Sequence, residues 1–203
     1  PSCADITGRV LEAISLFGYR KGCPQADRAI AFLQDQQEPE GCWFGRWGVN
    51  YIYGTCFALR GLRAAGEDPR EAYIIRAGEW LRSIQNADGG WGESCESYDN
   101  PDLKGQGPST ASQTSWALLG LFASDDVSSE SVERGIEYLL ATQTDRGTWE
   151  EPYFTGTGFP RVFYLRYHLY RHYFPLLALS EYTRLTGSKL KSLESAAPRN
   201  GTH

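Results

Sequence analysis

Gln37-Glu-Pro-Glu-Gly41-Cys-Trp43 is the stretch that decides the fold, because the chain repeats its pattern twice more. The copies are Gln85-Asn-Ala-Asp-Gly89-Gly-Trp91 and Gln143-Thr-Asp-Arg-Gly147-Thr-Trp149. A single match to the pattern Gln-x-x-x-Gly-x-Trp would carry little weight. Three matches, each preceded at fixed distances by an aromatic residue and a leucine, indicate a structural repeat.

Each copy follows a segment in which apolar residues recur with helical spacing, at residues 29–33, 74–84 and 132–140. We expect each of these helices to end at the Gln of the motif. The Gly of the motif is expected to take the left-handed conformation that closes a helix end. Charged residues between the apolar ones indicate a solvated face, so these segments are predicted to be outer helices.

A second, more apolar set of segments alternates with the first. Residues 55–62 and 114–121 align residue for residue, and residues 6–14 and 173–179 are looser relatives. Faces rich in Ala, Gly and Leu are typical of helices packed closely on both sides, which predicts inner helices. The fold class is therefore predicted to be all-α, with about seven helices in a double-layered α/α array and almost no strands.

Length and charge narrow the class of protein. The 203 residues suit one domain; we expect it to span residues 1–188, with a flexible tail at 189–203 where the periodicity is lost. The net charge of −5 argues against a nucleic-acid binder, and no apolar run is long enough to span a bilayer. The chain has no Met and begins Pro-Ser-Cys, so we expect a piece of a longer protein.

The cysteines and histidines do not predict a metal site. No two of the five cysteines have Cys-x-x-Cys spacing, which favours reduced, apolar cysteines and an intracellular compartment. His168 and His172 have the i, i+4 spacing of two ligands on one helix face, but Leu169 stands where a zinc protease has its Glu. We therefore expect neither a metal nor another cofactor.

Aromatic residues are concentrated between positions 153 and 174. Five of them recur at steps of three or four residues, which predicts one face of a helix: Phe159, Phe163, Tyr167, Tyr170 and Phe174. Periodicity alone favours a buried stripe that packs the core. The same residues would also suit the wall of a cavity that holds a cation, because the faces of aromatic rings attract positive charge.

Three further segments, residues 1–8, 43–55 and 153–160, complete a resemblance to the bacterial squalene–hopene cyclases, in which the repeat is called the QW motif. The resemblance covers residues 1 to about 186 and implies the C-terminal part of an α/α toroid, a partial (α/α)6 barrel with one open edge. It also implies an isomerase that cyclises squalene to hopene or hopanol through carbocations. The resemblance implies no cofactor for this reaction.

The resemblance assigns a substrate-binding role to five aromatic residues, which in the family line the cavity: Trp47, Phe159, Phe163, Tyr167 and Tyr170. The two phenylalanines would stabilise the later cations. We expect Trp47, Phe159 and Phe163 to face one shared hollow.

Asp5, Arg9 and Tyr51 are the candidate catalytic residues. By resemblance, Asp5 and Tyr51 belong to the hydrogen-bond network of the catalytic acid, and Arg9 pairs with that acid. Without the resemblance, Asp5 and Arg9 indicate only a helix-start carboxylate and a surface ion pair. The family's Asp-x-Asp-Asp acid motif is not found in this sequence, so the chain alone is expected not to cyclise squalene.

Two other functions remain possible from the residues. A protein prenyltransferase β subunit shares the toroid but needs zinc ligands, and a toroidal binding module like the thioester domains of complement-like proteins would have no catalysis. The resemblance implies squalene or a related linear isoprenoid as substrate, a homodimer, and peripheral (monotopic) contact with the cytoplasmic membrane. The Gln and Trp of each repeat are expected to be structural.

Overall fold

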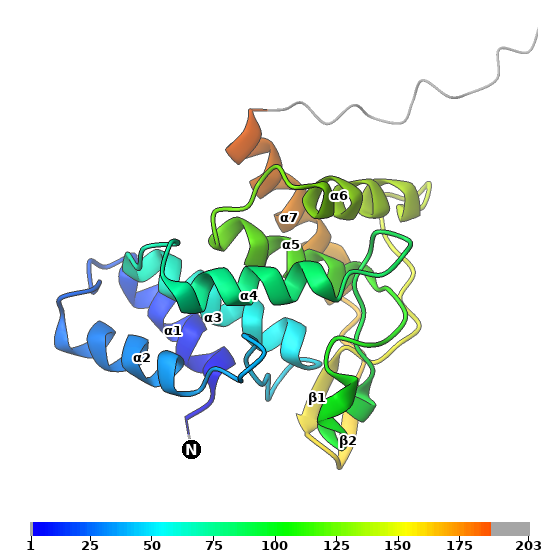
Figure 1. The fold of residues 1–203 in the computed structure, drawn as a ribbon. Helices are drawn as coiled ribbons and strands as arrows, with labels where there is room; N and C mark the ends of the chain where they lie inside the picture. Colours follow the sequence, from blue (N-terminus) through cyan, green and yellow to red (C-terminus); the bar gives the residue numbers. More distant parts are fainter. Residues whose placement is uncertain (1, 188–203) are drawn as a thin grey trace, which may run out of the picture.

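The computed structural model describes residues 2–187, and within this range the chain forms two layers of α-helices (Figure 1). The inner layer contains α1 (Ala4–Ser15), α3 (Tyr51–Ala65), α5 (Ala111–Ala123) and α7 (Tyr170–Thr186). The outer layer contains α2 (Pro24–Asp35), α4 (Ala72–Ser83) and α6 (Glu130–Thr142). Inner helices contact one another in chain order. Among the outer helices, α2 packs on α1 and α3, α4 packs on α3 and α5, and α6 packs on α5. The predicted alternation is confirmed, whereas the tail predicted at 189–203 lies outside the described residues.

The three repeat motifs form the same turn. Each outer helix ends one or two residues before the motif Gln, close to the predicted end. The motif glycines have positive φ, as predicted, with values of 104° at Gly41, 87° at Gly89 and 72° at Gly147. They lie in the turn beyond the helix and do not cap it, since each glycine N–H donates to the carbonyl oxygen three residues earlier.

The Trp of each motif is buried and fastens the turn to the outer helix that precedes it. Its indole N–H donates to the carbonyl oxygen of the leucine ten residues earlier, in the last turns of that helix: Trp43 to Leu33, Trp91 to Leu81, and Trp149 to Leu139. Carbonyl groups at a helix C-terminus have no partner within the helix, so this bond satisfies one of them.

The Gln of each motif joins one repeat to the next. Its side-chain amide donates to the motif Gly carbonyl oxygen in all three copies. Gln37 also donates to Tyr73 at the start of α4, and Gln85 donates to Ser131 at the start of α6. These bonds confirm the structural role predicted for the motif.

Glycines allow the inner helices to approach closely. A Cβ atom on Gly8 of α1 would overlap the Phe57 carbonyl oxygen, and one on Gly61 of α3 would overlap the Gly8 carbonyl oxygen. The row of inner helices also curves. Arg60 of α3 bonds Glu12 of α1 at 2.6 Å and Glu181 of α7 at 3.0 Å, so both ends of the row meet at one guanidinium group.

The prediction of one helix face over residues 159–174 is wrong before Tyr170, where α7 begins. Residues there form an antiparallel hairpin, β1 (Gly156–Phe159) and β2 (Phe163–Leu165), whose turn contains Arg161 at φ 68°. The expectation of almost no strands missed this element. Alternating Thr and Gly residues before Phe159 favour extended backbone over helix, and α7 begins only at Tyr170.

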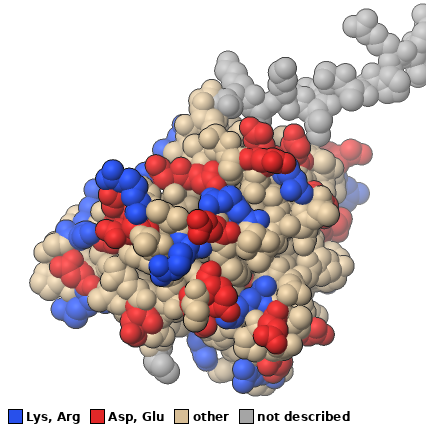
Figure 2. Space-filling model, viewed as in Figure 1, with Lys and Arg blue, Asp and Glu red and all other residues tan. Residues whose placement is uncertain are grey.

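The remaining long connection, between α4 and α5, contains two short 3₁₀ helices, η1 (Cys95–Tyr98) and η2 (Pro101–Leu103). Figure 2 shows acidic and basic side chains interspersed over the face that it displays. The two edge helices of the inner layer expose apolar side chains, at Ile6 and Val10 of α1 and at Leu176 and Leu177 of α7, and the connections expose others, such as Phe17 and Val162.

Candidate functional site

An aromatic cluster joins α3, α5 and α7 on the inner layer. Trp116 of α5 lies at its centre, with ring centroids 4.9 Å from Tyr53, 5.7 Å from Tyr170 and 5.3 Å from Phe174. All three contacts are edge-to-face, the geometry that the ring quadrupoles favour. Phe57 extends the cluster by contacting Tyr53 at 4.7 Å and Phe174 at 6.2 Å. The cluster holds several ring faces at fixed angles.

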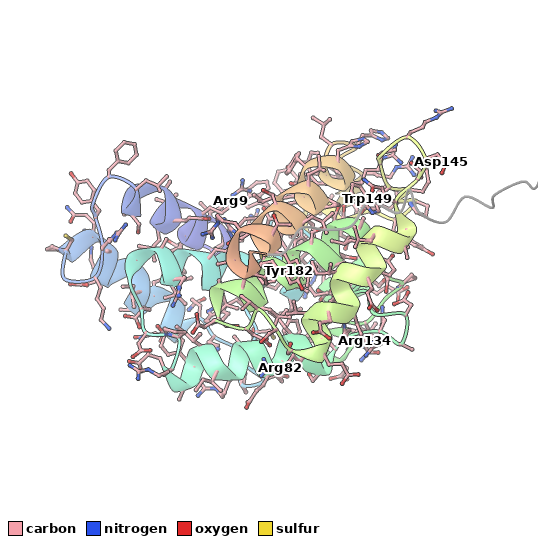
Figure 3. All side chains as sticks on the ribbon, turned by 90° about the horizontal axis from the view of Figure 1, so that it is seen from above. Arg9, Arg82, Arg134, Asp145, Trp149 and Tyr182 are labelled. Atoms are coloured by element: carbon pink, nitrogen blue, oxygen red, sulfur yellow. The ribbon has the colours of Figure 1, made fainter. Side chains whose placement is uncertain are left out.

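Arg9 brings a positive charge to this cluster from α1 (Figure 3). Its Nη1 donates to the Tyr53 hydroxyl at 3.1 Å, and its guanidinium carbon lies 4.7 Å from the centre of the Phe57 ring. Burial raises the pKa of Tyr53 to about 12, although the nearby guanidinium opposes this rise. Tyr53 therefore stays protonated at neutral pH and can accept from Arg9 while donating its own proton to another group.

Asp5 is fully buried and does not form the ion pair with Arg9 that its spacing suggested. Its Oδ2 accepts hydrogen bonds from the backbone N–H groups of Arg46 at 3.1 Å and Trp47 at 2.9 Å. Its Oδ1 accepts from the N–H of Ile6 at 3.0 Å. The interpretation of Asp5 and Arg9 as a surface pair is therefore wrong. Asp5 joins the start of α1 to the turn that carries Trp47.

The structure places Tyr51 away from Arg9 and puts Tyr53 there. Tyr51 packs edge-on against Phe44 at 5.8 Å, and the Lys104 ammonium lies 5.0 Å from the Tyr51 ring centre. Residues at positions i and i+2 of a helix point in directions that differ by about 200° around its axis. Only one of the two tyrosines can therefore face the cluster. Sequence reasoning missed Tyr53. Its i, i+4 spacing with Phe57, which faces the same way, was the available signal.

Trp47 borders a hollow of about 910 Å³ on the outer side of α1. Ile6, Val10 and Ile14 of α1 and Ala29 of α2 line this hollow, which is largely apolar. The Trp47 ring is 38% exposed.

The other predicted ring residues lie on and after the hairpin. Phe159 and Phe163 pair with each other at 5.6 Å, and both are about half exposed. Tyr167 contacts Tyr170 at 4.8 Å, and these two tyrosines border a second hollow of about 440 Å³. Phe159 and Phe163 line neither this hollow nor the one beside Trp47. The described residues thus bring Tyr170 into the central cluster but do not join Trp47, Phe159 and Phe163 in either of these two hollows.

The hairpin and the Trp47 turn are nevertheless neighbours through their backbones. The Thr157 N–H donates to the Trp47 carbonyl oxygen at 3.4 Å, and the Val49 N–H donates to the Thr155 carbonyl oxygen at 3.0 Å. Backbone hydrogen bonds therefore join the two segments even though their aromatic rings face different surroundings.

Residues 2–187 contain no group of three His, Cys, Asp or Glu side chains placed to hold a metal ion. His172 instead bonds Thr148 through Nδ1 at 2.6 Å, and all five cysteines are free. Across the same residues, no helix has the length and apolar character needed to cross a membrane.

Comparisons with known proteins identify the family. The sequence profile of the squalene-hopene cyclase C-terminal domain matches residues 1–184. Squalene–hopene cyclases from Alicyclobacillus acidocaldarius and Bradyrhizobium diazoefficiens are 51% and 49% identical over 90% and 91% of this chain. A dammaradiene synthase from Dryopteris crassirhizoma is 48% identical over 94% of it. These matches span 29%, 28% and 31% of the three relatives, so the chain corresponds to less than a third of their length.

A solved structure supports the fold independently. ent-Copalyl diphosphate synthase from Streptomyces platensis superposes with a TM-score of 0.63 at 20% identity, over 93% of this chain and 34% of that one. The match is consistent with the predicted α/α toroid. The family match therefore favours a triterpene cyclase over the two alternative functions considered from the sequence, a prenyltransferase β subunit and a binding module without catalysis. The chain belongs to the squalene–hopene cyclase family and corresponds to its C-terminal domain.

Proposed function

We propose that this chain forms part of the wall of a cavity in which squalene, or a related linear isoprenoid, is cyclised through carbocations. The observation that carries the proposal is the edge-to-face cluster around Trp116, with Arg9 and Tyr53 at its rim. Ring faces attract a cation without bonding to it, and the attraction reaches about 2 kcal/mol or more where water is excluded.

Each group has a distinct task in this proposal. The central rings and the hairpin phenylalanines would replace water around the migrating positive charge. Arg9 would pair with an acid that protonates the substrate, and Tyr53, held by Arg9 at 3.1 Å, would donate or relay a proton through its hydroxyl. Asp5 would act on Trp47, because its carboxylate oxygens already bind backbone N–H groups.

The product and setting of the reaction are also proposals. Hopene or hopanol is the proposed product, although the dammaradiene synthase among the relatives shows by its name that similar chains serve other triterpene products. A homodimer in contact with the cytoplasmic membrane, inside the cell, would suit a substrate that dissolves in lipid and not in water. The family resemblance is what supports the proposed homodimer and its contact with the membrane.

Phe163→Ala tests the proposal in the full natural protein, incubated with squalene in detergent and followed by mass spectrometry of the products. Wild-type protein should form a pentacyclic product, and the variant should release partially cyclised products because one ring face is lost. Phe17→Ala is the control, because Phe17 is 80% exposed in the connection after α1. Absence of any cyclised product from the wild type would contradict the function, and an unchanged product profile in Phe163→Ala would contradict the role of the ring.

A further inference from the structure

The start of α3 receives its cap from a distant loop. Asn50 precedes the helix, and its own side chain does not cap the helix. Instead, Glu93 Oε2 accepts hydrogen bonds from the N–H groups of Asn50 at 3.1 Å and Ile52 at 3.0 Å. N–H groups in the first turn have no partner within the helix, and a carboxylate also suits the positive end of the helix dipole. Glu93 therefore supplies the cap that the local sequence lacks.

Glu93 is itself held rigidly. Its backbone N–H donates to Gln113 Oε1 at 3.1 Å, and Gln113 Nε2 donates to the Glu93 and Val49 carbonyl oxygens, both at 3.0 Å. Glu93 is 4% exposed, and no Lys or Arg among the described residues forms an ion pair with it. A buried carboxylate without a cation is costly. The compensation here comes from the backbone donors at the start of α3, which bind Oε2, whereas Oε1 is buried without a hydrogen-bond partner among the described residues.

The arrangement recurs in the repeat. Glu93 stands two residues after the motif residue Trp91, and Glu151 stands two residues after the next motif Trp. Glu151 binds the N–H and hydroxyl of Ser112 at the start of α5, both at 2.9 Å, and the hydroxyl of Thr155 at 3.0 Å. Each of these carboxylates thus binds the start of the inner helix that precedes its own motif.

The first motif departs from this rule. Gly45 occupies the equivalent position, and a Cβ atom there would overlap the Asn50 carbonyl oxygen, which leaves no room for a longer side chain. Here the carboxylate lies on the inner helix instead of the turn: Asp5, at the start of α1, accepts hydrogen bonds from the N–H groups of Arg46 and Trp47 in the turn after the motif. The turn at residues 45–50 is consequently held by Asp5 at one end and by Glu93 at the other.

We propose that Glu93 is a positioning residue for the aromatic wall: it fixes the Trp47 turn and the start of α3, and through α3 the orientation of Tyr53. The effect of Glu93 on the reaction rests on the function proposed above. Its effect on the position of Trp47 and the start of α3 does not. Glu93 acts entirely through backbone groups, so it is not a catalytic residue. Its loss should disturb Trp47 and the first turn of α3 before it disturbs the rest of the fold.

Acrylamide quenching of tryptophan fluorescence tests the geometry in the purified chain. Trp47 is 38% exposed, whereas the other five tryptophans are at most 7% exposed: Trp43, Trp80, Trp91, Trp116 and Trp149. Quenching therefore reports on Trp47. Glu93→Ala should change the quenching constant of Trp47, and hydrogen exchange of the Asn50 and Ile52 amides should become roughly tenfold faster or more. Glu93→Gln retains an acceptor oxygen and should stay close to wild type in both measurements.

Glu67→Ala is the matched control. Glu67 is also a glutamate that is 4% exposed, but it pairs with Lys21, away from the Trp47 turn. The control should lower stability while leaving Trp47 quenching and the Asn50 and Ile52 amides unchanged. If Glu93→Ala does not fold, Glu93→Asp replaces it, because a shorter carboxylate cannot reach both amides. The proposal is overturned if the Glu93 variant leaves both measurements at wild-type values, or if Glu67→Ala changes them equally.

A second measurement connects the geometry to the reaction in the full natural protein. Glu93→Asp should lower kcat for squalene and increase the share of partially cyclised products, with little change in KM, because substrate binding uses many other contacts. Glu93→Gln should restore most of the wild-type product profile. If the quenching and exchange results hold while no squalene is converted even by the wild type, the proposed function fails and the positioning of Trp47 stands. Altered geometry with an unchanged product profile would overturn the role of Glu93 in the wall.

Discussion

Individual side chains in this protein are placed by contacts that lie far apart in the sequence. Asp5 binds N–H groups more than 40 residues away, and Arg9 meets Tyr53 across two helices. The resemblance predicted candidate site residues of two kinds, charged residues on α1 and aromatic residues near the hairpin, and their roles in a reaction stay predictions. The sequence-based prediction named Tyr51 and gave Tyr53 no role, since which of the two faces Arg9 depends on the rotation of α3 about its axis. Packing of Tyr53 against Trp116 contributes to this rotation, together with the Glu93 hydrogen bonds at the start of α3.

The buried glutamates predict a pH dependence of stability. Burial raises the pKa of Glu93 and of Glu151, although the hydrogen-bond donors at the starts of α3 and α5 oppose the rise. The folded carboxyl groups thus hold protons more tightly than the unfolded ones. Their contribution to stability is complete below about pH 4.3, the usual Glu value, and is lost as the pH rises through the raised values.

Urea unfolding at several pH values checks this prediction. The free energy of unfolding of the wild type, minus that of a Glu93→Gln, Glu151→Gln double variant, should increase as the pH falls from about 7 to about 5. The double variant cannot titrate at either position, so it serves as the reference. A difference that does not vary with pH would show that neither carboxyl group has a raised pKa.

At the level of elements, helices were the predictable part and the hairpin was not. Three copies of one motif, each with a helical apolar pattern before it, left little freedom for α2, α4 and α6. The aromatic spacing at 159–174 matched a helix only by coincidence. Phe159 ends β1 and Phe163 begins β2, so the step of four residues between them spans the hairpin turn and makes the two residues partners across it. Glycines at 156 and 158 were the contrary signal, since tyrosine and phenylalanine rings pack where their side chains would be.

Because α1 and α3 cross closely, adding a single methyl group at the crossing should lower the stability of the protein strongly. Gly61→Ala should destabilise the protein by about 3 kcal/mol, since the new Cβ meets backbone atoms of α1 that cannot move separately from the helix. Gly78→Ala in α4 is the comparison. A Cβ there meets mainly the Ser124 hydroxyl, at 3.1 Å, so the higher helix propensity of Ala should leave stability unchanged or raise it by up to about 1 kcal/mol. Equal effects in thermal or urea unfolding would refute the close crossing.

The motif glutamines should differ in their effect on stability. Gln85→Ala removes bonds to Gly89 and to Ser131 of the next outer helix, and we expect a loss of roughly 2 kcal/mol. Gln143 donates only to Gly147 among the described residues, at 3.2 Å, so Gln143→Ala should cost roughly 0.5–1 kcal/mol. Chemical unfolding of both variants measures the difference. A cost for Gln143→Ala that matches or exceeds that for Gln85→Ala would show that the link between repeats contributes nothing.

The molecule as a whole is a curved double layer whose two edge helices, α1 and α7, expose apolar residues to solvent. The central inner helices α3 and α5 are covered on both sides, which is why their positions follow from composition alone. The relative placement of Trp47 and the hairpin phenylalanines is different, because it depends on backbone contacts between loops with no periodic pattern. The family and the layer order could therefore be predicted, but not the arrangement of the hollows.

The central claim, that ring faces of this chain stabilise positive charge during cyclisation, can be tested by weakening one ring without changing its shape. Phe163 in the full natural protein would be replaced by phenylalanines that carry one, two or three fluorine atoms, which withdraw electron density from the ring face. We predict that the logarithm of the rate of complete cyclisation of squalene falls with each added fluorine, while the same series at Phe17 has no effect. A rate that does not depend on fluorination at Phe163 would contradict the account.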